Sequence, residues 1–460
     1  MREAREIWKE PMDFVSTRNQ NNKVSFTQAI TNCLCADGGL YVPSASEDMR
    51  PWIYYLKETT SFASIAGSLT SALMKNEFSP LVSEAIATKA FPFSPEFTQL
   101  DDNLYKLSLF TGPTGSHKDF GVSYLVNCLE YTLLLQDKTA TVFAVSDGEI
   151  ASSLAHAMRG KKQLKALILY SKGSMRGFED CDCIWNGGNI FPVEVDGSLA
   201  DCSLLARQLF SRQDLVQKYN LTLANTVNIG RLLPQTFFYL YAFSRLRGKV
   251  HGDIFYAVAP GNYGNIVAGL YGWKWSLPVN AFITECTQDL NLDSSGKAHL
   301  NVDSSPFAQR PWVDPGSPSN LERLEEVFQT QPLMLRGLIF PQTVSEPERE
   351  AACKELFLKY GIFANGETAG SYAAAQKYTE NFIDKDSSVV LVSRDHPALS
   401  GENLGSLAGS FYGRNWISGI CGKAPVLPEF LQRLLEPIQP EKKISCNLNE
   451  LEALLQEIAG

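Results

Sequence analysis

The stretch Thr111-Gly-Pro-Thr-Gly-Ser-His-Lys-Asp-Phe-Gly121 is the part of the sequence from which the fold and the chemistry of this chain are best predicted. Its glycines and proline enforce a turn, and the apolar residues after Phe120 predict a helix that begins at or near Lys118. Near the positive end of a helix dipole, and partly shielded from water, the ammonium form of a lysine is disfavoured. The neutral amine can then bond covalently to an aldehyde cofactor. Spacing alone leaves open the alternative of a solvated surface lysine.

Beyond about residue 104, short β-rich runs alternate with helical stretches, which is typical of a parallel sheet covered by helices. The sequence therefore predicts an α/β fold. Because 460 residues exceed the usual size of one hydrophobic core, two or three packed units are expected. The predicted strands cover residues 139–145, 165–170, 190–195, 254–259, 281–285 and 388–392, and the predicted helices 149–159, 229–246, 264–275, 345–359, 368–380 and 447–458.

The composition is that of an ordinary globular protein, with 44% hydrophobic and 20% charged residues. A net charge of -9 disfavours nucleic acid and anionic membrane surfaces as partners and favours a small-molecule substrate. No apolar run reaches the roughly 20 residues that cross a bilayer, and no signal peptide is recognisable, so we expect a cytoplasmic protein. Ten scattered cysteines without a Cys-x-x-Cys pair, and five histidines without metal-binding spacing, predict reduced thiols and no metal site.

Three further segments follow predicted strands, at the sheet edge where ligands collect in α/β folds. Pro260–Asn265 joins a strand to a helix through glycines and presents backbone N–H groups to an anion, although a plain tight turn is the alternative. Ser146–Glu149 brings Asp147 and Glu149 to the same edge, where they either meet a ligand or cap the next helix. Ser393–Pro397 brings an arginine and an aspartate to this edge, where they either meet a ligand or form only a surface ion pair.

These segments occur in the order, and at roughly the intervals, of the threonine synthase family, which the chain resembles over nearly its whole length. The sequence Lys118-Asp119-Phe120-Gly121 is similar to the family's cofactor-lysine motif, and Gly261-Asn262-Tyr263-Gly264 to its phosphate-binding loop. Further matches are Ser16-Thr17-Arg18, Gly38-Gly39-Leu40-Tyr41-Val42-Pro43, Gly112-Pro113-Thr114, Gly187-Gly188-Asn189-Ile190, Asn225–Gln235 and His396-Pro397, the last within a stretch that the family has as Thr-Ala-His-Pro.

The resemblance implies a pyridoxal 5'-phosphate (PLP) enzyme of fold type II, with two parallel-sheet α/β domains and an N-terminal, mostly helical cap. The implied divisions are 1–100 for the cap, 101–235 for the smaller, lysine-bearing domain and 236–460 for the larger domain. Lys118 would hold PLP as a Schiff base. The implied cofactor contacts are Lys118, Asn228, Gly261, Asn262, Tyr263, Gly264 and Arg394, and the implied substrate contacts are Thr114, Ser146, Asp147, Glu149 and Arg231.

Several departures from the family's pattern lie on the substrate side. The family's Thr-Ser-Gly-Asp-Thr-Gly is here Ser146–Ala151, which replaces two hydroxyls and adds the carboxylate of Asp147. The carboxylate of Asp147 would repel a substrate phosphate, because both groups are negatively charged. The family's Asp-Pro-His region reads Asn365-Gly366-Glu367, and the histidine that heads its Gly-Pro-Thr motif is Thr111. These changes indicate an altered substrate site on an intact scaffold.

Two departures concern the cofactor. Pro260 stands for a serine and offers neither a hydroxyl nor an N–H to the cofactor phosphate. Arg394 stands for the threonine that meets the pyridine nitrogen, and a cation there would keep that nitrogen unprotonated. An alignment shifted by one residue would put Ser393 or Asp395 at this place instead.

Three functions remain open at this level. The family default converts O-phosphohomoserine and water to threonine and phosphate. The second is a divergent PLP lyase or replacement enzyme that acts at the β- or γ-carbon of another amino acid. The third is a non-catalytic scaffold that binds PLP. The sequence does not define the native substrate, the oligomeric state or the role of the polar stretch 289–319.

Overall fold

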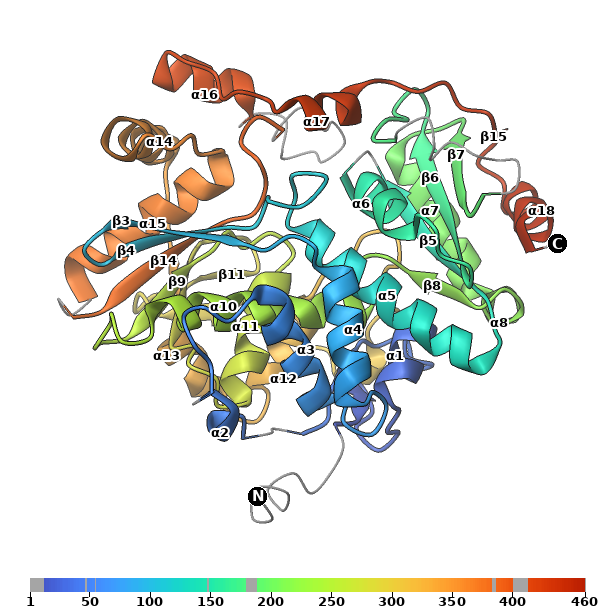
Figure 1. Cartoon of the computed structure of the whole chain (residues 1–460), viewed down its shortest axis with the longest axis horizontal. Helices are drawn as coiled ribbons and strands as arrows, with labels where there is room; N and C mark the ends of the chain where they lie inside the picture. Colours follow the sequence, from blue (N-terminus) through green and yellow to red (C-terminus); the bar gives the residue numbers. More distant parts are fainter. Residues whose placement is uncertain are drawn as a thin grey trace.

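A computed structural model describes residues 12–45, 48–53, 55–146, 149–178, 188–382, 386–399 and 413–459. Figure 1 shows two sheets on either side of the long helix α5 (Lys118–Gln136), with most helices of the N-terminal region below them. Both sheets are largely parallel and covered by helices. The predicted α/β fold with an N-terminal, mostly helical cap is therefore confirmed.

The larger sheet has six strands in the order β13-β10-β9-β14-β4-β3. All neighbours pair in parallel except β3, which pairs antiparallel with β4 at the edge. The neighbours β9, β14 and β4 carry the three candidate site segments at their carboxyl ends. The bounds are β3 Glu96–Asp101, β4 Leu104–Ser108, β9 Ile254–Ala257, β10 Ala281–Glu285, β13 Ile339–Gln342 and β14 Ser388–Ser393.

The smaller sheet has five parallel strands in the order β15-β7-β6-β5-β8. Its central strands are buried on both faces, which explains why their sequences are nearly continuous apolar runs. The bounds are β5 Ala140–Ser146, β6 Leu164–Ser171, β7 Ile190–Val195, β8 Leu221–Leu223 and β15 Lys443–Ile444.

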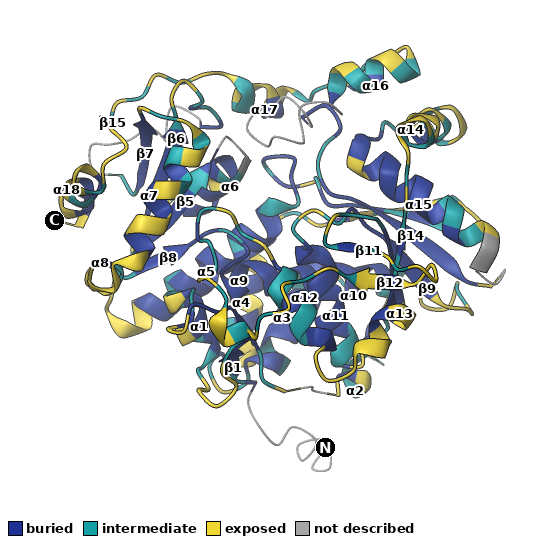
Figure 2. Cartoon of the chain, turned by 180° about the vertical axis from the view of Figure 1, so that it is seen from behind, coloured by how far each residue is buried: buried dark blue, intermediate teal, exposed yellow. Residues whose placement is uncertain are grey.

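Helices cover both faces of each sheet. On the smaller sheet, α5 and α6 (Glu149–Met158) pack on one face, and α7 (Leu199–Ser211), α8 (Gln213–Lys218) and α18 (Leu448–Ala459) on the other. On the larger sheet, α14 (Glu346–Tyr360) and α15 (Gly366–Phe382) cover one face, while α10 (Thr236–Leu246) and α11 (Gly264–Lys274) cover the other. Figure 2 shows the buried strands enclosed by helices that are exposed on their outer sides.

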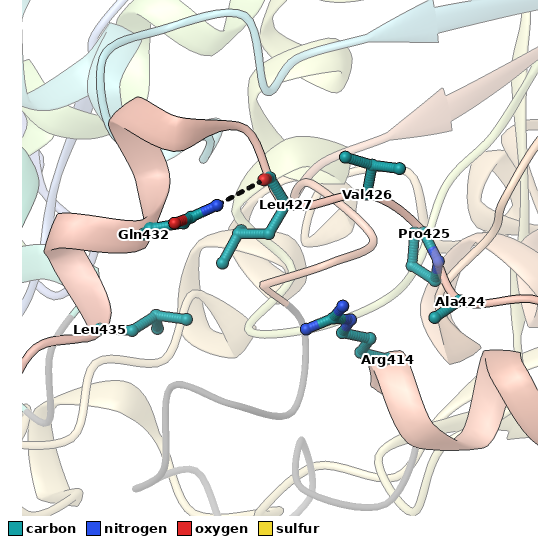
Figure 3. Close-up of a pocket in the computed structure, with 7 residues that line it drawn as sticks. All are labelled: Arg414, Ala424, Pro425, Val426, Leu427, Gln432 and Leu435. Atoms are coloured by element: carbon teal, nitrogen blue, oxygen red, sulfur yellow. Dashed lines mark hydrogen bonds between the residues drawn. The ribbon is translucent and has the colours of Figure 1, made fainter.

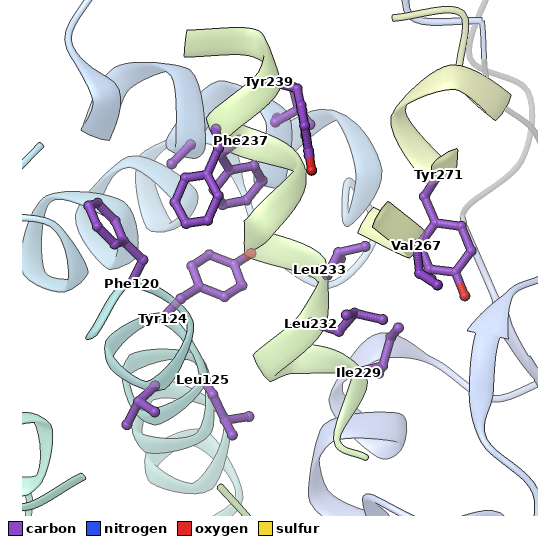
Figure 4. Packing of buried hydrophobic residues seen from close by; sticks show 14 of the residues in the cluster. Phe120, Tyr124, Leu125, Ile229, Leu232, Leu233, Phe237, Tyr239, Val267 and Tyr271 are labelled. Carbon is purple, nitrogen blue, oxygen red and sulfur yellow. The ribbon is translucent and has the colours of Figure 1, made fainter. Parts of the chain in front are cut away.

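The helical layer below the sheets is packed through aromatic rings. The Phe120 ring meets the Phe62 ring edge-on at 5.2 Å, and the Tyr124 ring meets the Phe237 ring at 5.4 Å. Figure 4 shows Phe120, Tyr124 and Phe237 projecting from α5 and α10 into one buried cluster. Aromatic pairs in this geometry add about 0.5–1.5 kcal/mol each to the stability from buried area. The helix that begins at Lys118 is thus held rigidly from below.

The N-terminal region supplies α1 (Phe26–Asn32), α2 (Arg50–Ile53), α3 (Phe62–Leu73) and α4 (Pro80–Ala90), with β1 (Phe14–Ser16) paired to β2 (Tyr41–Pro43). Serines cap three of these helices: Ser25 on α1, Ser61 on α3 and Ser79 on α4. Such caps satisfy backbone N–H groups that the first turn leaves unpaired.

All six predicted strands and all six predicted helices are present. The helix predicted over 229–246 is interrupted at Leu233–Gln235 by a 3-10 turn containing Pro234, which separates α9 (Ile229–Leu232) from α10. The sequence did not reveal β4, β8 or β13. Lys106 breaks the apolar run of β4, β8 has three residues, and Pro341 lies within β13.

The sheets are not consecutive in the chain. Strand β4 belongs to the larger sheet although it precedes the smaller one, and β15 returns to the smaller sheet near the C-terminus. The domain limits at residues 100 and 235 stay a prediction. Among the described helices, none combines the length and the apolar character needed to span a bilayer.

The polar stretch 289–319 includes a small antiparallel hairpin, β11 (Leu290–Leu292) with β12 (Ala298–Leu300), and then runs back across the molecule. Arg18 donates to the carbonyl of Pro311 at 2.7 Å, and Arg207 on α7 pairs with Asp314 at 2.7 Å. The stretch therefore connects the N-terminal region to a helix of the smaller sheet.

A buried arginine completes this connection from α12 (Leu321–Phe328). Arg323 is fully buried and donates to the carbonyls of Tyr41 at 3.0 Å, Thr226 at 2.5 Å and Val227 at 2.8 Å. It thereby satisfies three main-chain acceptors from two distant segments. This buried cation is tolerated because carbonyl oxygens and the side-chain oxygen of Asn320 accept its hydrogen bonds.

We predict that Arg323→Met lowers the free energy of unfolding by about 3 kcal/mol, because buried carbonyls lose their donors. Urea unfolding followed by circular dichroism measures the change. The control Arg212→Met removes an exposed arginine paired with Asp214 and is expected to cost less than about 1 kcal/mol. Equal losses in the two variants would contradict the role given to Arg323.

Candidate active site

The three segments singled out in the sequence converge at one edge of the larger sheet. The turn before Lys118 follows β4, Arg394 follows β14 and the loop 260–264 follows β9, and these strands are direct neighbours. Neighbouring strands lie about 4.8 Å apart, so the outer two are separated by roughly 10 Å. A planar ligand the size of an aromatic ring with one substituent spans that distance.

Backbone hydrogen bonds lock the first two segments together. The His117 N–H donates to the Arg394 carbonyl at 2.8 Å, and the His396 N–H donates to the Gly115 carbonyl at 2.8 Å. Between them, Ser116 and Asp395 form an isolated antiparallel bridge. The position of Lys118 is therefore fixed by β14 as well as by its own strand.

Lys118 is the first residue of α5 and is partly buried. Its backbone N–H donates to the Ser116 hydroxyl at 3.3 Å, while His117 at the N-cap makes no side-chain cap bond. The predicted location at a helix start is confirmed.

Behind Lys118, Asp119 is buried and bound by three donors. Its carboxylate accepts from the Thr114 N–H at 2.9 Å, the Thr114 hydroxyl at 2.6 Å and the Ser153 hydroxyl at 2.8 Å. Burial raises the pKa of Asp119 to about 6, while these donors and the nearby charge of Arg231 act in the opposite direction. The side chain of Thr114 is committed to Asp119, and Gly112 leaves room for that carboxylate.

Arg231, on the short helix α9, is buried beside Gly121. Its Nε and Nη1 atoms have no hydrogen-bond partner among the described residues. Burial lowers the pKa of Arg231 to about 10, opposed by the charges of Asp119 and Asp395. The guanidinium thus stays protonated at neutral pH and retains unused donors, as an anion-binding arginine requires.

The loop between β9 and α11 is strained and anchored. Gly261 and Tyr263 both have left-handed backbone, with φ of 47° and 64°. The Asn262 amide donates to the Thr226 hydroxyl at 2.9 Å, and its oxygen accepts from the Gly264 N–H at 3.3 Å. The Asn320 N–H donates to the Asn262 carbonyl at 3.1 Å. The loop is therefore fixed from behind, at the start of α11.

Arg394 lies between this loop and α15. Its guanidinium pairs with Glu367 at 2.6 Å and donates weakly to the Asn265 side chain at 3.4 Å. A Cβ on Gly261 would lie 2.6 Å from its Nη1, so only glycine fits there. Ser393 instead contacts Thr368 at 3.1 Å, and Asp395 contacts Ser116 at 2.5 Å. Within the described part of the chain, Arg394 is thus the one of the three candidate residues whose side chain reaches Asn265, which follows the loop.

Asp395 accepts from the Ser116 hydroxyl at 2.5 Å and contacts Nδ1 of His117 at 3.2 Å. Burial lowers the pKa of His117 to about 4, although Asp395 acts in the opposite direction, so the imidazole is neutral at pH 7. His117, Lys118 and Arg394 lower the pKa of Asp395 against the effect of its burial. An ionised carboxylate is therefore held next to Lys118.

The comparisons with known proteins agree with this geometry. Residues 13–91 match the family model described as threonine synthase N terminus. The threonine synthase of Buchnera aphidicola subsp. Schizaphis graminum is 29% identical over 78% of this chain and 84% of its own length. That of Escherichia coli K12 is 27% identical over 86% of this chain and 91% of its own length.

Over most of its length the chain is therefore similar to threonine synthases, and its N-terminal region matches the N-terminal model of that family. The crystal structure of PLP-bound threonine synthase from Brucella melitensis superposes with a TM-score of 0.77 and 21% identity, covering 97% of this chain and 99% of that one. At this identity the likeness concerns the fold, and it confirms the predicted fold type II architecture.

Two residues implied by the family resemblance have other partners. Asn228 is fully buried, caps α9 through the Gly230 N–H, and donates to the Ile30 carbonyl and the Thr222 hydroxyl. With both amide N–H groups used, it positions Arg231 and has no donor left for a cofactor. The Ser146 hydroxyl accepts from the Ala151 N–H at 3.1 Å and so caps α6. Asp147 and the side chain of Glu149 lie outside the described residues.

A cavity of about 160 Å³ adjoins the region and is lined by Pro113, Thr114 and Ser152 together with Phe430 of α17 (Glu429–Gln432). A separate cavity of about 530 Å³, shown in Figure 3, lies between α16 (Arg414–Cys421) and α17 and is lined by none of the predicted site residues.

From the sequence, Asp119 and His117 received no role, and Glu367 was noted only as a departure. Asp395 was expected at the sheet edge or as an alternative partner of the pyridine nitrogen. Asp119 contacts Thr114, while His117 and Glu367 both contact Arg394. Proximity to Lys118 in sequence was the available signal for Asp119 and His117. The pairing of Glu367 with Arg394 requires the packing of α15 against β14, which the sequence does not specify.

We predict that Gly121→Ala disturbs Arg231, because a Cβ at residue 121 would lie 2.5 Å from the Arg231 carbonyl. Overpacking of this kind costs about 1–3 kcal/mol, measured as a fall in the free energy of unfolding. Gly337→Ala is the control, since no atom lies within 4 Å of a Cβ there. A Gly121→Ala variant as stable as the control would show that the contact relaxes freely.

Proposed function

We propose that this chain catalyses the threonine synthase reaction, converting O-phosphohomoserine and water to threonine and phosphate with PLP bound at Lys118. The observation that carries the proposal is the arrangement of Lys118, Arg394 and the 261–264 loop on three neighbouring strands. It supplies an amine at one end and an anion-binding loop at the other, at the spacing of one pyridine ring and its phosphate.

The residues present fit PLP. The glycines of the loop allow close approach of the backbone, and the first turn of α11 directs N–H groups toward an anion. Pro260 weakens the phosphate contact, because it lacks an N–H. Arg394, which follows the strand between the two ends, would supply a cationic donor that cannot give up its proton. We assign Gly261, Asn262, Tyr263, Gly264 and Arg394 to the cofactor, but not Asn228.

Bound PLP supplies an electron sink for the charge that develops at the substrate carbon atoms. Lys118 would be the base: its Nζ, when free, would remove protons from Cα and Cβ of the substrate and return protons to Cα and Cγ. The bond between Cγ and the phosphate oxygen would break, the hydroxyl of water would add at Cβ, and the remaining proton of water would leave with the phosphate.

Arg231 is the proposed contact for an anionic group of the substrate. Its unpaired Nε and Nη1 atoms would donate to a carboxylate or phosphate oxygen, and the bonds of Asn228 hold α9 in place. Thr114 supports the site indirectly through Asp119. Ser146, Asp147 and Glu149 are proposed to lie at the substrate side, with the Ser146 hydroxyl shared with the helix cap.

The family relatives favour this reaction over a divergent lyase or replacement enzyme and over a non-catalytic scaffold, because the relatives named above are threonine synthases that match most of the chain. A small amino acid is thus the proposed substrate. The net charge of -9 disfavours nucleic acid as a partner, and a cytoplasmic location stays part of the proposal.

We predict that Lys118→Ala abolishes turnover. In PLP-loaded wild-type protein, the absorbance band near ~420 nm disappears on borohydride reduction, and peptide mapping finds the label on Lys118. Phosphate release from O-phosphohomoserine measures the activity. Lys172→Ala, which removes an exposed lysine paired with Asp196, retains the band and the activity. Turnover by Lys118→Ala, or no phosphate release by PLP-loaded wild-type protein, would contradict the proposal.

A further inference from the structure

Asn265 carries a buried donor that the proposed reaction does not use. It is the second residue of α11, directly after the 261–264 loop, and is 4% exposed. Its side-chain nitrogen Nδ2 is buried and has no hydrogen-bond partner among the described residues. An unpaired buried donor destabilises a folded protein, and a bound ligand is one way of satisfying it.

The contacts of Asn265 fix the orientation of its side chain. The oxygen Oδ1 accepts from Nη1 of Arg394 at 3.4 Å. The amide cannot be turned round, because Nδ2 and the guanidinium group are both donors. The main-chain carbonyl of Asn265 accepts from the Tyr239 hydroxyl at 2.6 Å, so the backbone is anchored as well. Nδ2 is therefore a fixed donor beside Arg394.

The same guanidinium nitrogen lies against the loop. A Cβ on Gly261 would lie 2.6 Å from Nη1 of Arg394, the atom that also binds Asn265. The side-chain amide of Asn265 and the backbone of Gly261 thus lie on either side of one atom. Both belong to the part of the site that is proposed to hold the cofactor phosphate.

Capping of α11 does not account for Asn265. The N-cap residue of this helix is Tyr263, whose side chain makes no cap bond, and the Gly264 N–H donates to the side chain of Asn262. The loop does lack one donor, because Pro260 has neither an N–H nor a hydroxyl. An amide donor beside Gly261 would compensate for that loss.

We propose that the side-chain amide of Asn265 is a further cofactor contact, in which Nδ2 donates to an oxygen of the PLP phosphate. The inference rests on the proposed function, because the phosphate is that of PLP held at Lys118. Oδ1 keeps its bond to Arg394, so one side chain joins the phosphate end of the cofactor to the guanidinium group.

The test is a titration of PLP-free Asn265→Leu protein with PLP, followed by the absorbance near ~420 nm, and with pyridoxal, which lacks the phosphate. Leucine has about the size of asparagine and no donor. We expect the Kd for PLP to rise about tenfold to a hundredfold, because a hydrogen bond to a charged group is lost, and the Kd for pyridoxal to change less than about twofold. Equal losses for the two ligands would overturn the assignment to the phosphate.

Urea unfolding of the PLP-free protein separates a ligand contact from a structural role. Because Nδ2 of Asn265 has no partner to lose, Asn265→Leu is expected to leave the unfolding midpoint unchanged or to raise it. Asn189→Leu is the matched contrast, since the Asn189 amide donates to the carbonyls of Met158 at 2.8 Å and Leu164 at 3.1 Å. That variant is expected to lower the midpoint and to keep the affinity for PLP.

The outcomes distinguish this inference from the function on which it rests. If wild-type protein does not bind PLP, the proposed function fails. If wild type binds PLP and Asn265→Leu binds it equally well, the function stands and the role of Asn265 is refuted. Should Asn265→Leu fail to fold, Asn265→Asp keeps an oxygen for Arg394 and replaces the donor by a second oxygen. Its affinity for PLP is expected to fall at least as far, because the carboxylate repels the phosphate.

Discussion

The site depends on one structural constraint: the turn that carries Lys118 is bonded to the segment that leaves the neighbouring strand. Two backbone hydrogen bonds of 2.8 Å, from His117 to Arg394 and from His396 to Gly115, join these loops beyond the ends of β4 and β14. Loops are usually the mobile part of an α/β fold. Here the strand pairing continues into them, so the lysine is held with the rigidity of the sheet.

The charges of the site are arranged in opposed sets. The buried Arg231 faces Asp119 and Asp395, and the buried Arg394 pairs with Glu367, which is exposed. Burying any one of these charges alone would cost several kcal/mol, and removing one member of a set would leave its partners uncompensated. The two departures from the family pattern at Arg394 and Glu367 are therefore one change: the carboxylate at the start of α15 compensates the cation at the end of β14.

Much of the larger architecture was predictable from the sequence. The apolar runs of β5, β6, β9, β10 and β14 are long enough to read as buried strands, and the glycine-proline turn before Lys118 correctly placed a helix start. The predictions were less successful where an element is short or polar, as in β4 with Lys106. Pairing across the sheet is a long-range property, so the order β9-β14-β4 that assembles the site could not be derived from local pattern.

The same limit explains which side-chain roles were predicted. Lys118 and the 261–264 loop have local signals, a turn with a lysine and a glycine-rich link between strand and helix. Asn228 also lies in a recognisable motif, yet its amide is used by Ile30, Thr222 and Gly230, which only the packed structure shows. Motifs that are shared with a family thus identify the region of a site more reliably than the contact made by each residue.

The contacts that support the 261–264 loop distinguish a rigid side of the site from a variable side. Thr226 accepts from the side chains of Asn262 and Asn320, and its carbonyl accepts from Arg323, so the loop is braced by α12 and by the segment before α9. These bonds lie behind the loop, away from the mouth of the site. Because the proposed cofactor side is fixed by main-chain geometry and buried polar bonds, we expect sequence changes on the proposed substrate side, such as those at Ser146–Ala151, to leave the positions of Lys118 and the loop intact.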